Sequence, residues 1–367
     1  MTDPLTLTEA LIAAALDAYP PDAARTAGGR ALFDHRACLE AGRRVAPASL
    51  GDAGAAALLD RDDLHWPSLT HPGAIVWPVL AATGVEGEAR WRAAHAGYEV
   101  TARLGCALGP EHRQHWHATT TAGTVGAAVA AALALGTDPV RAAGHAASVT
   151  GGSIVALLER SGTRAVHRDH AAATALRCAQ LAADIPATRA GLEHPRGLFA
   201  AMGGSPGALT APAERSALSE TSFRAHATTG FAQALVEAAR DHTAPGPADR
   251  VEAEAPAAAL ALADAPSPRD PEQAWWSCQH AVAVTLLGRD LDDAATVEDP
   301  RVAALRARVE LTASPTGGSA VVVAGRRTER AAAARLGDAD LVAKWRTLNP
   351  GAEPPLALLA TTDRRSP

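Results

Sequence analysis

Acidic and imidazole side chains are concentrated in one stretch of the chain, LLDRDDLHWPSLTHPGAIVWPVLAA. They are Asp60, Asp62, Asp63, His65 and His71. Together such groups can move protons, because histidine titrates near neutral pH and a carboxylate can hold the imidazole in place. The turn-rich WPSLTHPG is typical of a loop and AIVWPVLAA of a buried helix, so the stretch predicts a functional loop anchored by core helices. For Asp62 and Asp63, capping of a helix is the alternative role.

A second cluster, EHRQHWHATTTAGTVGAA, places histidines just before a threonine-rich helix start. Threonine hydroxyls and the free N–H groups of a helix N-terminus favour a bound anion, which predicts a carboxylate site. His115 and His117 also have the H-x-H spacing of metal ligands, but no third ligand follows at a recognisable spacing. We therefore expect no metal ion, and a metal hydrolase built on this pair is not supported.

A third cluster, SGTRAVHRDHAAATALR, brings Arg164, His167, Arg168 and Asp169 together before another helix. An arginine in such a loop can bind a carboxylate through two parallel N–H groups. A surface loop held by salt bridges is the alternative, above all for Arg168 and Asp169. His280, in AWWSCQHAVAVTLLG, lies on an apolar helix, where a core role and a functional role are both open.

Lysine chemistry has almost no basis, because Lys344 is the only lysine in 367 residues. A lysine base or Schiff base would have to use this residue. It stands in the amphipathic stretch DLVAKWRTL, where we expect it on the surface, so lysine catalysis is not expected. The cysteines lie far apart without a C-x-x-C pair, which favours buried thiols in a cytosolic chain over zinc or redox chemistry. They are Cys38, Cys106, Cys178 and Cys278.

The composition is that of an alanine-rich globular protein, with 47% hydrophobic and only 4% aromatic residues. Alanine favours closely packed helices, since its small side chain lets backbones approach and its helix propensity is the highest. The net charge of −6 and the lack of a basic stripe argue against nucleic-acid binding. The N-terminus lacks the basic region of a secretory signal, and no uninterrupted apolar run reaches about 18 residues. We therefore expect a cytoplasmic protein without a membrane span.

The elements that must position these clusters change type along the chain. Alanine-rich segments up to about residue 213 predict helices, among them one from about Thr121 to Gly136 and one from Pro139 to Gly151. From about Ser222, ADRVEAEAPAAALALA and RARVELTASPTGGSAVVVAGRR alternate with period two and predict strands. A helix from about Ala274 to Leu287 separates these two segments.

The fold class predicted from this order is mainly α with an α+β second domain. Residues 1–213 would form the helical domain, completed by residues 328–367, and residues 214–327 would form an α+β lid domain. Gly317-Gly318 would make a hairpin turn, and the chain would become helical again after Arg327.

The order of the clusters resembles the MmgE/PrpD family, which includes 2-methylcitrate dehydratases, cis-aconitate decarboxylases and iminodisuccinate epimerases. DRDDLHWPSLTHPG is similar to the family pattern D-F-D-D-T-H-x-P-S-x-x-H-P-G, and HATTTAGTVGAA to H-x-x-x-x-x-G-x-x-G-A-A. TRAVH, LEHPRGLFAA and WSCQH follow in the order of the family. The resemblance begins at about Leu58 and continues to the end, and the segment before it is shorter than is usual.

The resemblance implies an MmgE/PrpD-like helical domain that forms a homodimer, a smaller α+β lid, and an active site between them. It implies neither a metal nor an organic cofactor. A proton would be removed beside a carboxylate of a small di- or tricarboxylate or a carboxylated biosynthetic intermediate. Hydroxide or carbon dioxide would then leave, or the proton would return on the other face. The protein would be a lyase (a dehydratase or decarboxylase) or an isomerase.

The family also implies roles for residues at matching positions. His71 and His117 would be the main proton-transfer groups, Asp60 would fix an imidazole, and His280 is a further catalytic candidate. The candidates for substrate binding are His65, Arg164, His167 and Arg224.

Several positions depart from the family pattern. They are Arg61 for phenylalanine, Leu64 for threonine, Arg164 and Arg224 for lysine, Gln233 for histidine and His280 for tyrosine. Arginine keeps the positive charge but does not readily release a proton. We therefore expect a divergent enzyme whose substrate differs from methylcitrate and cis-aconitate. The alternative is a catalytically inactive relative that binds a carboxylate or a partner protein. The loss of the family lysine favours this alternative, whereas the retained His71 and His117 favour the enzyme.

Overall fold

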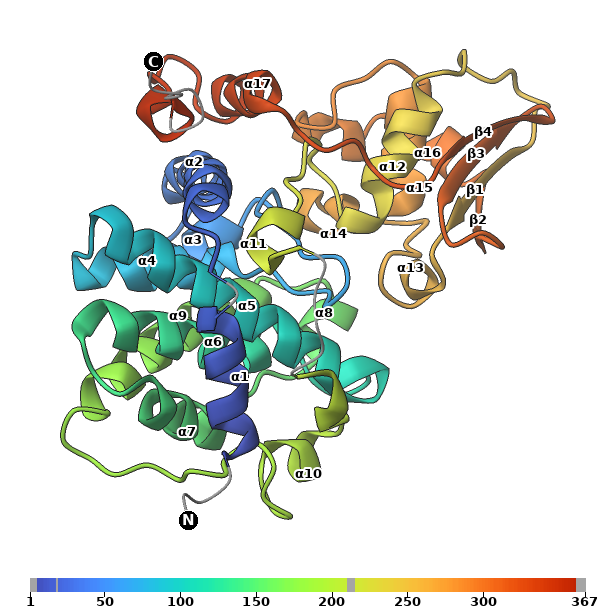
Figure 1. Ribbon diagram of the computed structural model, residues 1–367. Coiled ribbons are helices and arrows are strands. Elements are labelled where there is room, and N and C mark those ends of the chain that lie inside the picture. Colours follow the sequence, from blue (N-terminus) through green and yellow to red (C-terminus); the bar gives the residue numbers. More distant parts are fainter. Residues whose placement is uncertain (1–4, 18, 210–214, 361–367) are drawn as a thin grey trace.

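Two domains of different architecture make up the computed structural model, which describes residues 5–17, 19–209 and 215–360. In Figure 1 the larger, helical domain occupies the lower left and the smaller domain, with its sheet at the outer edge, the upper right. The predicted fold class, mainly α with an α+β second domain, is confirmed.

The helical domain is built around α6, which packs against α4, α5, α7 and α9. Its helices are α1 (Leu7–Asp17), α2 (Pro21–Arg43), α3 (Asp52–Ala57), α4 (Gly73–Thr83), α5 (Gly87–His112), α6 (Ala118–Leu135), α7 (Pro139–Val149), α8 (Val155–Leu158), α9 (Thr163–Leu181), α10 (Leu198–Met202), η1 (Pro206–Ala208) and α11 (Ala217–Glu220). The two helices predicted on either side of Asp138 are present as α6 and α7. Gly136 ends α6 in the left-handed conformation (φ 70°), and the Asp138 carboxylate caps α7 by accepting the N–H of Val140 at 2.9 Å.

α6 is apolar on all sides, because every side of it faces other helices. Its 18 residues have a mean hydropathy of 1.5, which is long and apolar enough for a membrane span, but 83% of them are buried within the protein. A helix that is hydrophobic all round is expected at the centre of a large helical domain.

Glycine allows the close approach of α5 and α6. A Cβ on Gly126 would come within 2.5 Å of the carbonyl oxygen of Gly97 and closer still to the Thr101 hydroxyl. Only the hydrogen atom of glycine fits at this contact, so a larger side chain at position 126 would push α5 and α6 apart.

We expect Gly126→Ala to lower the free energy of unfolding by about 1–2 kcal/mol, because an overpacked contact outweighs the gain in helix propensity. Urea denaturation measures the change. Gly162→Ala is the matched control: its φ is −58° and the nearest atoms to the added methyl lie at 3.9 Å. An equally stable Gly126→Ala protein would mean that the two helices separate at little cost.

The α+β domain contains a four-stranded sheet with the order β2-β1-β3-β4. Its elements are α12 (Gly230–Ala239), β1 (Val251–Ala255), α13 (Ala257–Leu262), α14 (Pro271–Trp275), α15 (Cys278–Leu286), η2 (Ala294–Val297), α16 (Pro300–Arg306), β2 (Val309–Ala313), β3 (Ser319–Val323) and β4 (Arg326–Arg330). β1 runs parallel to β2 and antiparallel to β3, while β3 and β4 are antiparallel. The helices between β1 and β2 supply the crossover that parallel pairing requires.

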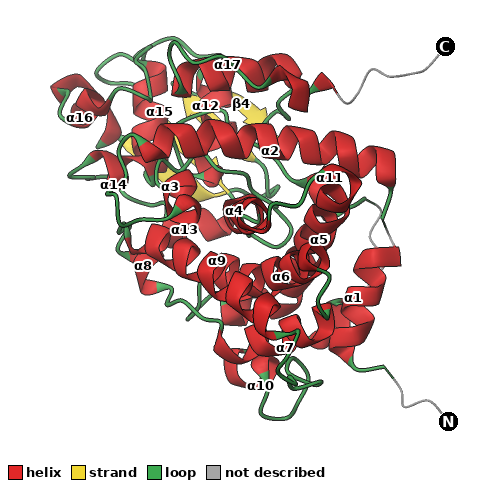
Figure 2. Ribbon diagram, turned by 90° about the vertical axis from the view of Figure 1, so that its left-hand side faces the viewer, coloured by secondary structure: helices red, strands yellow, loops and turns green. Residues whose placement is uncertain are grey.

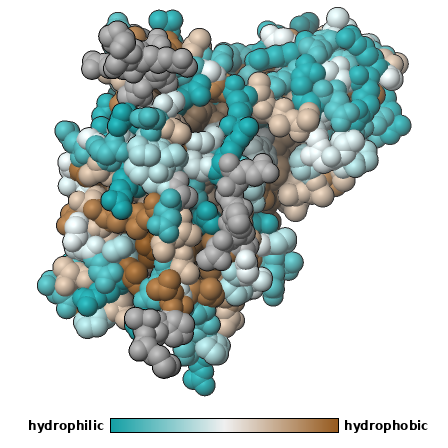
Figure 3. Space-filling view, viewed as in Figure 1, coloured by the Kyte–Doolittle hydropathy of each residue, from teal (hydrophilic) through white to brown (hydrophobic). Residues whose placement is uncertain are grey.

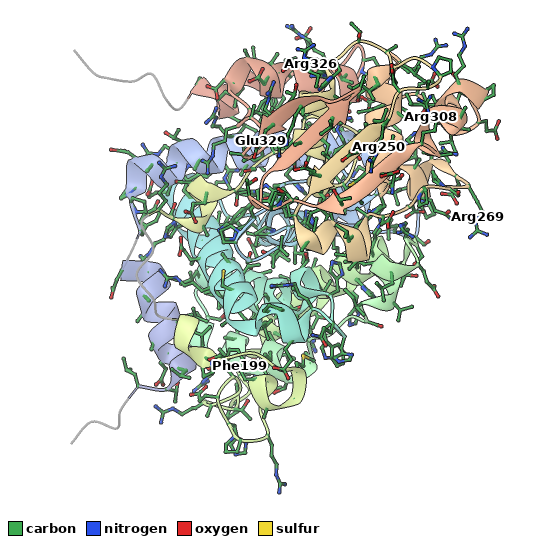
Figure 4. The ribbon with its side chains drawn as sticks, turned by 90° about the vertical axis from the view of Figure 1, so that its right-hand side faces the viewer. Phe199, Arg250, Arg269, Arg308, Arg326 and Glu329 are labelled. Atoms are coloured by element: carbon green, nitrogen blue, oxygen red, sulfur yellow. The ribbon has the colours of Figure 1, made fainter. Side chains whose placement is uncertain are left out.

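The period-two segments are strands, as predicted, because one face of the sheet is buried and the other is not. Val251, Ala253 and Val321 are fully buried in the core that α12 and α15 form with the sheet. The outer face carries ion pairs, including Arg250 with Glu310 at 2.7 Å. Figure 4 shows Arg250 and Glu329 on this outer side.

Three predictions about this part of the chain are wrong. Gly317-Gly318 does not close a hairpin, since β2 and β3 both pair with β1, which lies between them; the hairpin joins β3 to β4. The chain stays extended after Arg327, so the predicted boundary falls inside β4. The helix predicted over 274–287 is interrupted at Trp276-Ser277, where the Ser277 hydroxyl accepts the N–H of His280 and starts α15.

The C-terminal helix α17 (Asp338–Leu348) returns to the helical domain and packs on α2, ahead of the short η3 (Leu356–Leu358). Figure 2 shows α17 above α2, with the other helices of the helical domain below α2. Trp345 stacks on Phe33 at 5.5 Å in this contact. Lys344, predicted on the surface, is buried: its ammonium binds Asp34 Oδ1 at 2.5 Å and the carbonyl of Arg61 at 2.6 Å. Burial is tolerated because a carboxylate neutralises the charge.

Candidate active site

The acidic loop between α3 and α4, residues 58–72, is the point where the domains meet. Leu64 forms a β-bridge with Ser222 of the interdomain segment, and Arg61 pairs with Asp292 of the α+β domain at 2.5 Å. Asp60 (φ 57°) and Leu69 (φ 52°) have left-handed backbone conformations. Such strain in non-glycine residues persists only where surrounding contacts enforce it, and it is common at functional sites.

Two buried aspartates of this loop form ion pairs with three buried arginines. Asp60 lies between Arg164, whose Nη1 is 2.9 Å away, and Arg224, whose Nη1 donates to it at 2.6 Å. Asp62 accepts from Arg224 Nη2 and lies 3.4 Å from Arg168 Nη2. All five side chains are at most 4% exposed. The arrangement fixes the loop against α9 and the start of the second domain.

The ionisation of these groups follows from their pairing. Burial raises the pKa of Asp60, but Arg164 and Arg224 more than reverse this and hold it well below its usual range. The pKa of Asp62 is also lowered, since Arg168 and Arg224 outweigh its burial. Burial lowers the pKa of Arg168, with further lowering by Arg164 and Arg224. A buried guanidinium in this situation gains from an added anion.

His71 is placed as a neutral base. Its Nδ1 lies 2.5 Å from the backbone carbonyl of Asp63 and 3.5 Å from Asp62 Oδ2, so Nδ1 carries the proton and Nε2 keeps its lone pair. Burial lowers the pKa of His71 to about 4, although Asp62 opposes the shift. The side chain lines the pocket described below, so Nε2 is the available proton acceptor.

His117 precedes the first turn of α6 and lines the same pocket. Its Nδ1 lies 3.4 Å from Nδ1 of His167, so one ring can donate to the other. Burial, Arg168 and His167 lower the pKa of His117 well below its usual value. The adjacent Ala118 and Thr119 bring the N-terminus of an 18-residue helix to the pocket. An anion site there stays a prediction.

The pocket between the domains has a volume of about 740 Å³ including its open mouth. Residues of both domains line it: Leu64, Trp66, Leu69, His71, Arg113, Trp116, His117, Ala118, Thr119, Ile154, Leu157, Arg164, Arg168, Arg224, Thr229, Gly230, Phe231, Leu262 and Trp276. Arginines and two histidines thus share one cavity with many apolar side chains. It can hold an anion, transfer a proton and cover an apolar group.

Arg168, for which a salt-bridge role is the alternative predicted from the sequence, is well placed for a ligand. Within the described ranges its Nε and Nη1 are buried and have no hydrogen-bond partner. Arg164, predicted as the carboxylate clamp, faces the pocket but binds Glu272 at 3.2 Å as well as Asp60. Arg224 donates to both aspartates and to the Asp62 carbonyl at 2.8 Å. The protein's own carboxylates hold Arg224. Arg164 also has a buried Nε and Nη1 without a hydrogen-bond partner in the described chain, so its role as a substrate ligand stays a prediction.

Asp60 also has a different role from the one predicted. It contacts arginines and no imidazole, and the carboxylate beside His71 is Asp62. The reason is spacing: Arg164 and Arg168 lie one turn apart on α9 and reach successive loop carboxylates. The capping alternative fits Asp63, which accepts the N–H of Gly73 at 3.1 Å at the start of α4. It does not fit Asp62.

Four predicted site residues do not line the pocket: Asp60, His65, His167 and His280. His65 is bridged to Thr70 and its ring binds Ser68 at 2.8 Å, so it fixes the fold of the loop. His280 lies in the α+β domain, with Arg306 Nη1 at 3.2 Å from one ring nitrogen and Thr296 at 3.3 Å from the other. Both rings are held by protein groups. The core alternative, left open for His280, describes it better than proton transfer.

The H-x-H pair does not converge, because His115 is exposed while His117 is buried. Over residues 5–17, 19–209 and 215–360, no group of three or more His, Cys, Asp or Glu side chains is placed to hold a metal ion. The four cysteines are free thiols, three of them buried.

Two family-domain models match consecutive parts of the chain. The family model described as the MmgE/PrpD N-terminal domain matches residues 10–209, and that of the MmgE/PrpD C-terminal domain matches residues 224–354. A search among curated proteins finds no matching relative. Because the two matches cover nearly the whole chain in the expected order, the protein belongs to the MmgE/PrpD family.

Proposed function

We propose that the protein is a cofactor-independent lyase or isomerase that removes a proton next to a carboxylate. Its substrate is a small di- or tricarboxylate or a carboxylated biosynthetic intermediate. The observation that carries the proposal is the placement of two neutral histidines, His71 and His117, in one cavity with Arg168, whose Nε and Nη1 have no hydrogen-bond partner within the described chain.

The chemistry follows from charge. The substrate carboxylate binds Arg168 near the start of α6, and its negative charge raises the pKa of both imidazoles towards neutrality. His71 Nε2 then takes the proton from the adjacent carbon, while the arginines stabilise the charge that moves onto the carboxylate. His117 supplies the second proton: it protonates a departing hydroxide to give water, or protonates the opposite face of the same carbon in an epimerisation. In a decarboxylation no proton is removed first: the bond to carbon dioxide breaks, its electron pair stays on the carbon, and a protonated histidine then protonates that carbon.

Deuterium incorporation tests proton transfer at carbon, because a decarboxylation or an epimerisation in D2O places deuterium on the carbon and a reversible dehydration exchanges the proton next to the carboxylate. The purified protein is incubated in D2O with citrate, methylcitrate, cis-aconitate and larger carboxylates, and products are analysed by mass spectrometry and NMR. Activity that survives EDTA and dialysis would support metal independence. Binding without exchange or product for every carboxylate would contradict the proposal.

Carboxylate binding without turnover is the second candidate function. It is favoured by Arg164 and Arg224, which stand at lysine positions of the family pattern and are held by Asp60. Arginine cannot shuttle a proton, so only the histidines remain for chemistry. The exchange experiment separates the two candidates.

We also propose a cytoplasmic homodimer, as the family resemblance implies. The free, largely buried cysteines are compatible with a reducing compartment. On the face drawn in Figure 3, apolar residues gather over the helical domain and hydrophilic ones over the α+β domain, which favours the helical domain as the subunit contact. Light scattering gives the oligomeric state.

Arg168→Gln should weaken carboxylate binding by about 1.5–3 kcal/mol, the contribution of a hydrogen bond to a charged group. Asp62 keeps Arg224 as a partner, so folding should be retained. Titration calorimetry with any carboxylate that binds the wild-type protein measures the loss. Arg177→Gln, an exposed position on the same helix α9, is the control. Equal affinity of both variants would remove Arg168 from the binding site.

A further inference from the structure

We propose that the ligand of this site is a monocarboxylate with a bulky apolar group, such as an aromatic ring, and not a tricarboxylate. The inference rests on the proposed function, since it names the substrate class of the same cavity. Two independent features carry it: the charge balance of the cavity and the kind of side chains that form its walls.

The charge balance leaves room for one carboxylate. Four arginines line the cavity: Arg113, Arg164, Arg168 and Arg224. Three carboxylates pair with them: Asp60, Asp62 and Glu272. The histidines of the cavity are neutral. One positive charge is therefore uncompensated, and Arg168 and Arg113 each have buried N–H groups without a partner in the described chain.

A tricarboxylate would leave two negative charges without a counter-charge in a buried cavity, which is strongly unfavourable. The N-termini of α6 and α12, which also reach the cavity, add partial charges of about half a unit each. These do not amount to the two further charges that a tricarboxylate brings. Asp63, in the same loop, accepts a hydrogen bond from Tyr98 at 2.8 Å, and any negative charge it carries lowers the net positive charge further.

Scarce aromatic residues are concentrated in the walls. The chain has 7 tryptophans, 2 tyrosines and 4 phenylalanines, and Trp66, Trp116, Trp276 and Phe231 all line this cavity. Trp66 and Phe231 form an edge-to-face pair at 5.9 Å, so they present one continuous apolar surface. Aromatic side chains in such walls favour apolar or aromatic ligand groups.

The apolar walls belong to both domains. Trp116, Ile154 and Leu157 come from the helical domain, and Phe231, Leu262 and Trp276 from the α+β domain. Trp276 also lies against the Arg164 guanidinium, 5.4 Å from its ring. The apolar part of the ligand would thus lie between the domains, beside the arginines that hold the carboxylate.

Unreactive ligands test the proposal by titration calorimetry on the full-length protein. 3-Phenylpropionate has one carboxylate and a ring, tricarballylate has three carboxylates and no ring, and 3-phenylpropionamide has a ring and no charge. We expect 3-phenylpropionate to bind about tenfold or more tightly than either of the others, since both the ring and the charge contribute. The proposal is wrong if tricarballylate binds as tightly as 3-phenylpropionate, or if none of the three binds.

A matched pair of variants on α13 tests the apolar wall. Leu262→Ala should weaken 3-phenylpropionate binding about tenfold, because it removes apolar contact area from the cavity. Leu260→Ala changes a 38% exposed leucine on the same helix, which does not line the cavity, and should leave the affinity unchanged. Equal affinities of the two variants would contradict the predicted contact.

The deuterium experiment separates this inference from the proposed function. If 3-phenylpropionate binds tightly but no carboxylate undergoes exchange, the lyase or isomerase function fails and the ligand class stands. If citrate or cis-aconitate undergoes exchange and 3-phenylpropionate does not bind, the function stands and the ligand class fails.

Discussion

The His71→Gln protein is expected to fold normally and to turn over about 10²–10⁴ times more slowly than the wild type, the usual contribution of a general base. Glutamine keeps a hydrogen-bonding side chain near the Asp63 carbonyl but cannot accept a proton at neutral pH. Steady-state kinetics on the first substrate found by deuterium exchange gives the rate, and circular dichroism with thermal melting reports on the fold.

His115→Gln is the control for this variant, since His115 is exposed and does not line the cavity. It should keep wild-type turnover. A His71→Gln enzyme that works at the rate of the control would show that His71 only supports the loop, and His117 would then remain as the base.

The pH profile gives a second readout of the same residue. Because burial lowers the pKa of His71 to about 4, its imidazole is neutral and competent above that pH. kcat/KM, which reports the free enzyme, should therefore stay level as pH falls through 6.5 and decline only near 4. A decline centred near 6.5 would assign the titration to a more exposed group.

Arg224→Met is expected to lower the free energy of unfolding by about 3–5 kcal/mol, because removing one partner of a buried ion pair leaves the other charge buried and unpaired. Arg224 donates to Asp60 and Asp62, so its loss leaves two buried carboxylates with only Arg164 and Arg168. Urea denaturation measures the change.

Arg301→Met, at an exposed position on α16, is the control and should change stability by less than about 0.5 kcal/mol. Adding Asp60→Asn to Arg224→Met should recover part of the loss, because it removes one uncompensated charge. If Arg224→Met is as stable as the control, the ion pairs do not contribute to folding.

The ion pairs of Asp60 also predict how the stability of the protein falls at acid pH. The pKa of Asp60 is lower in the folded chain than in the unfolded one, so its stabilisation is fully present above about pH 3.9 and is lost as pH falls towards the folded value. Without Arg224 the folded pKa of Asp60 is higher, so less stabilisation is present above about pH 3.9 and the loss on acidification should be smaller.

Local patterns predicted the elements and the clusters because each depends on neighbours in the sequence. Gly136 marks the end of α6, and Asp138-Pro139 marks the start of α7, whatever the tertiary structure around them. In the same way, alternation in VEAEA and SAVVV predicts half-buried strands. Strand order is a tertiary property, so the local sequence at Gly317-Gly318 predicts a hairpin although β1 lies between the two strands that it connects.

The chemical partners of the site residues could not be predicted in the same way. Arg164 and Arg168 are four residues apart on one face of α9, and only the position of the acidic loop decides which of them is neutralised. His65 and His71 stand in one short loop, yet the bridge between His65 and Thr70 turns the first into the protein and leaves the second at the cavity.

Buried Lys344 has a practical consequence for protein chemistry. Since it is the only lysine, a reagent that acylates amines has one side-chain target in the whole chain, and that target is bound to Asp34 beneath α2 and the acidic loop. Native protein should therefore resist acylation of its lysine, and the modification should appear at the rate at which α17 detaches. A single mass shift, located on one peptide, would report the opening of the contact that joins the end of the chain to the site.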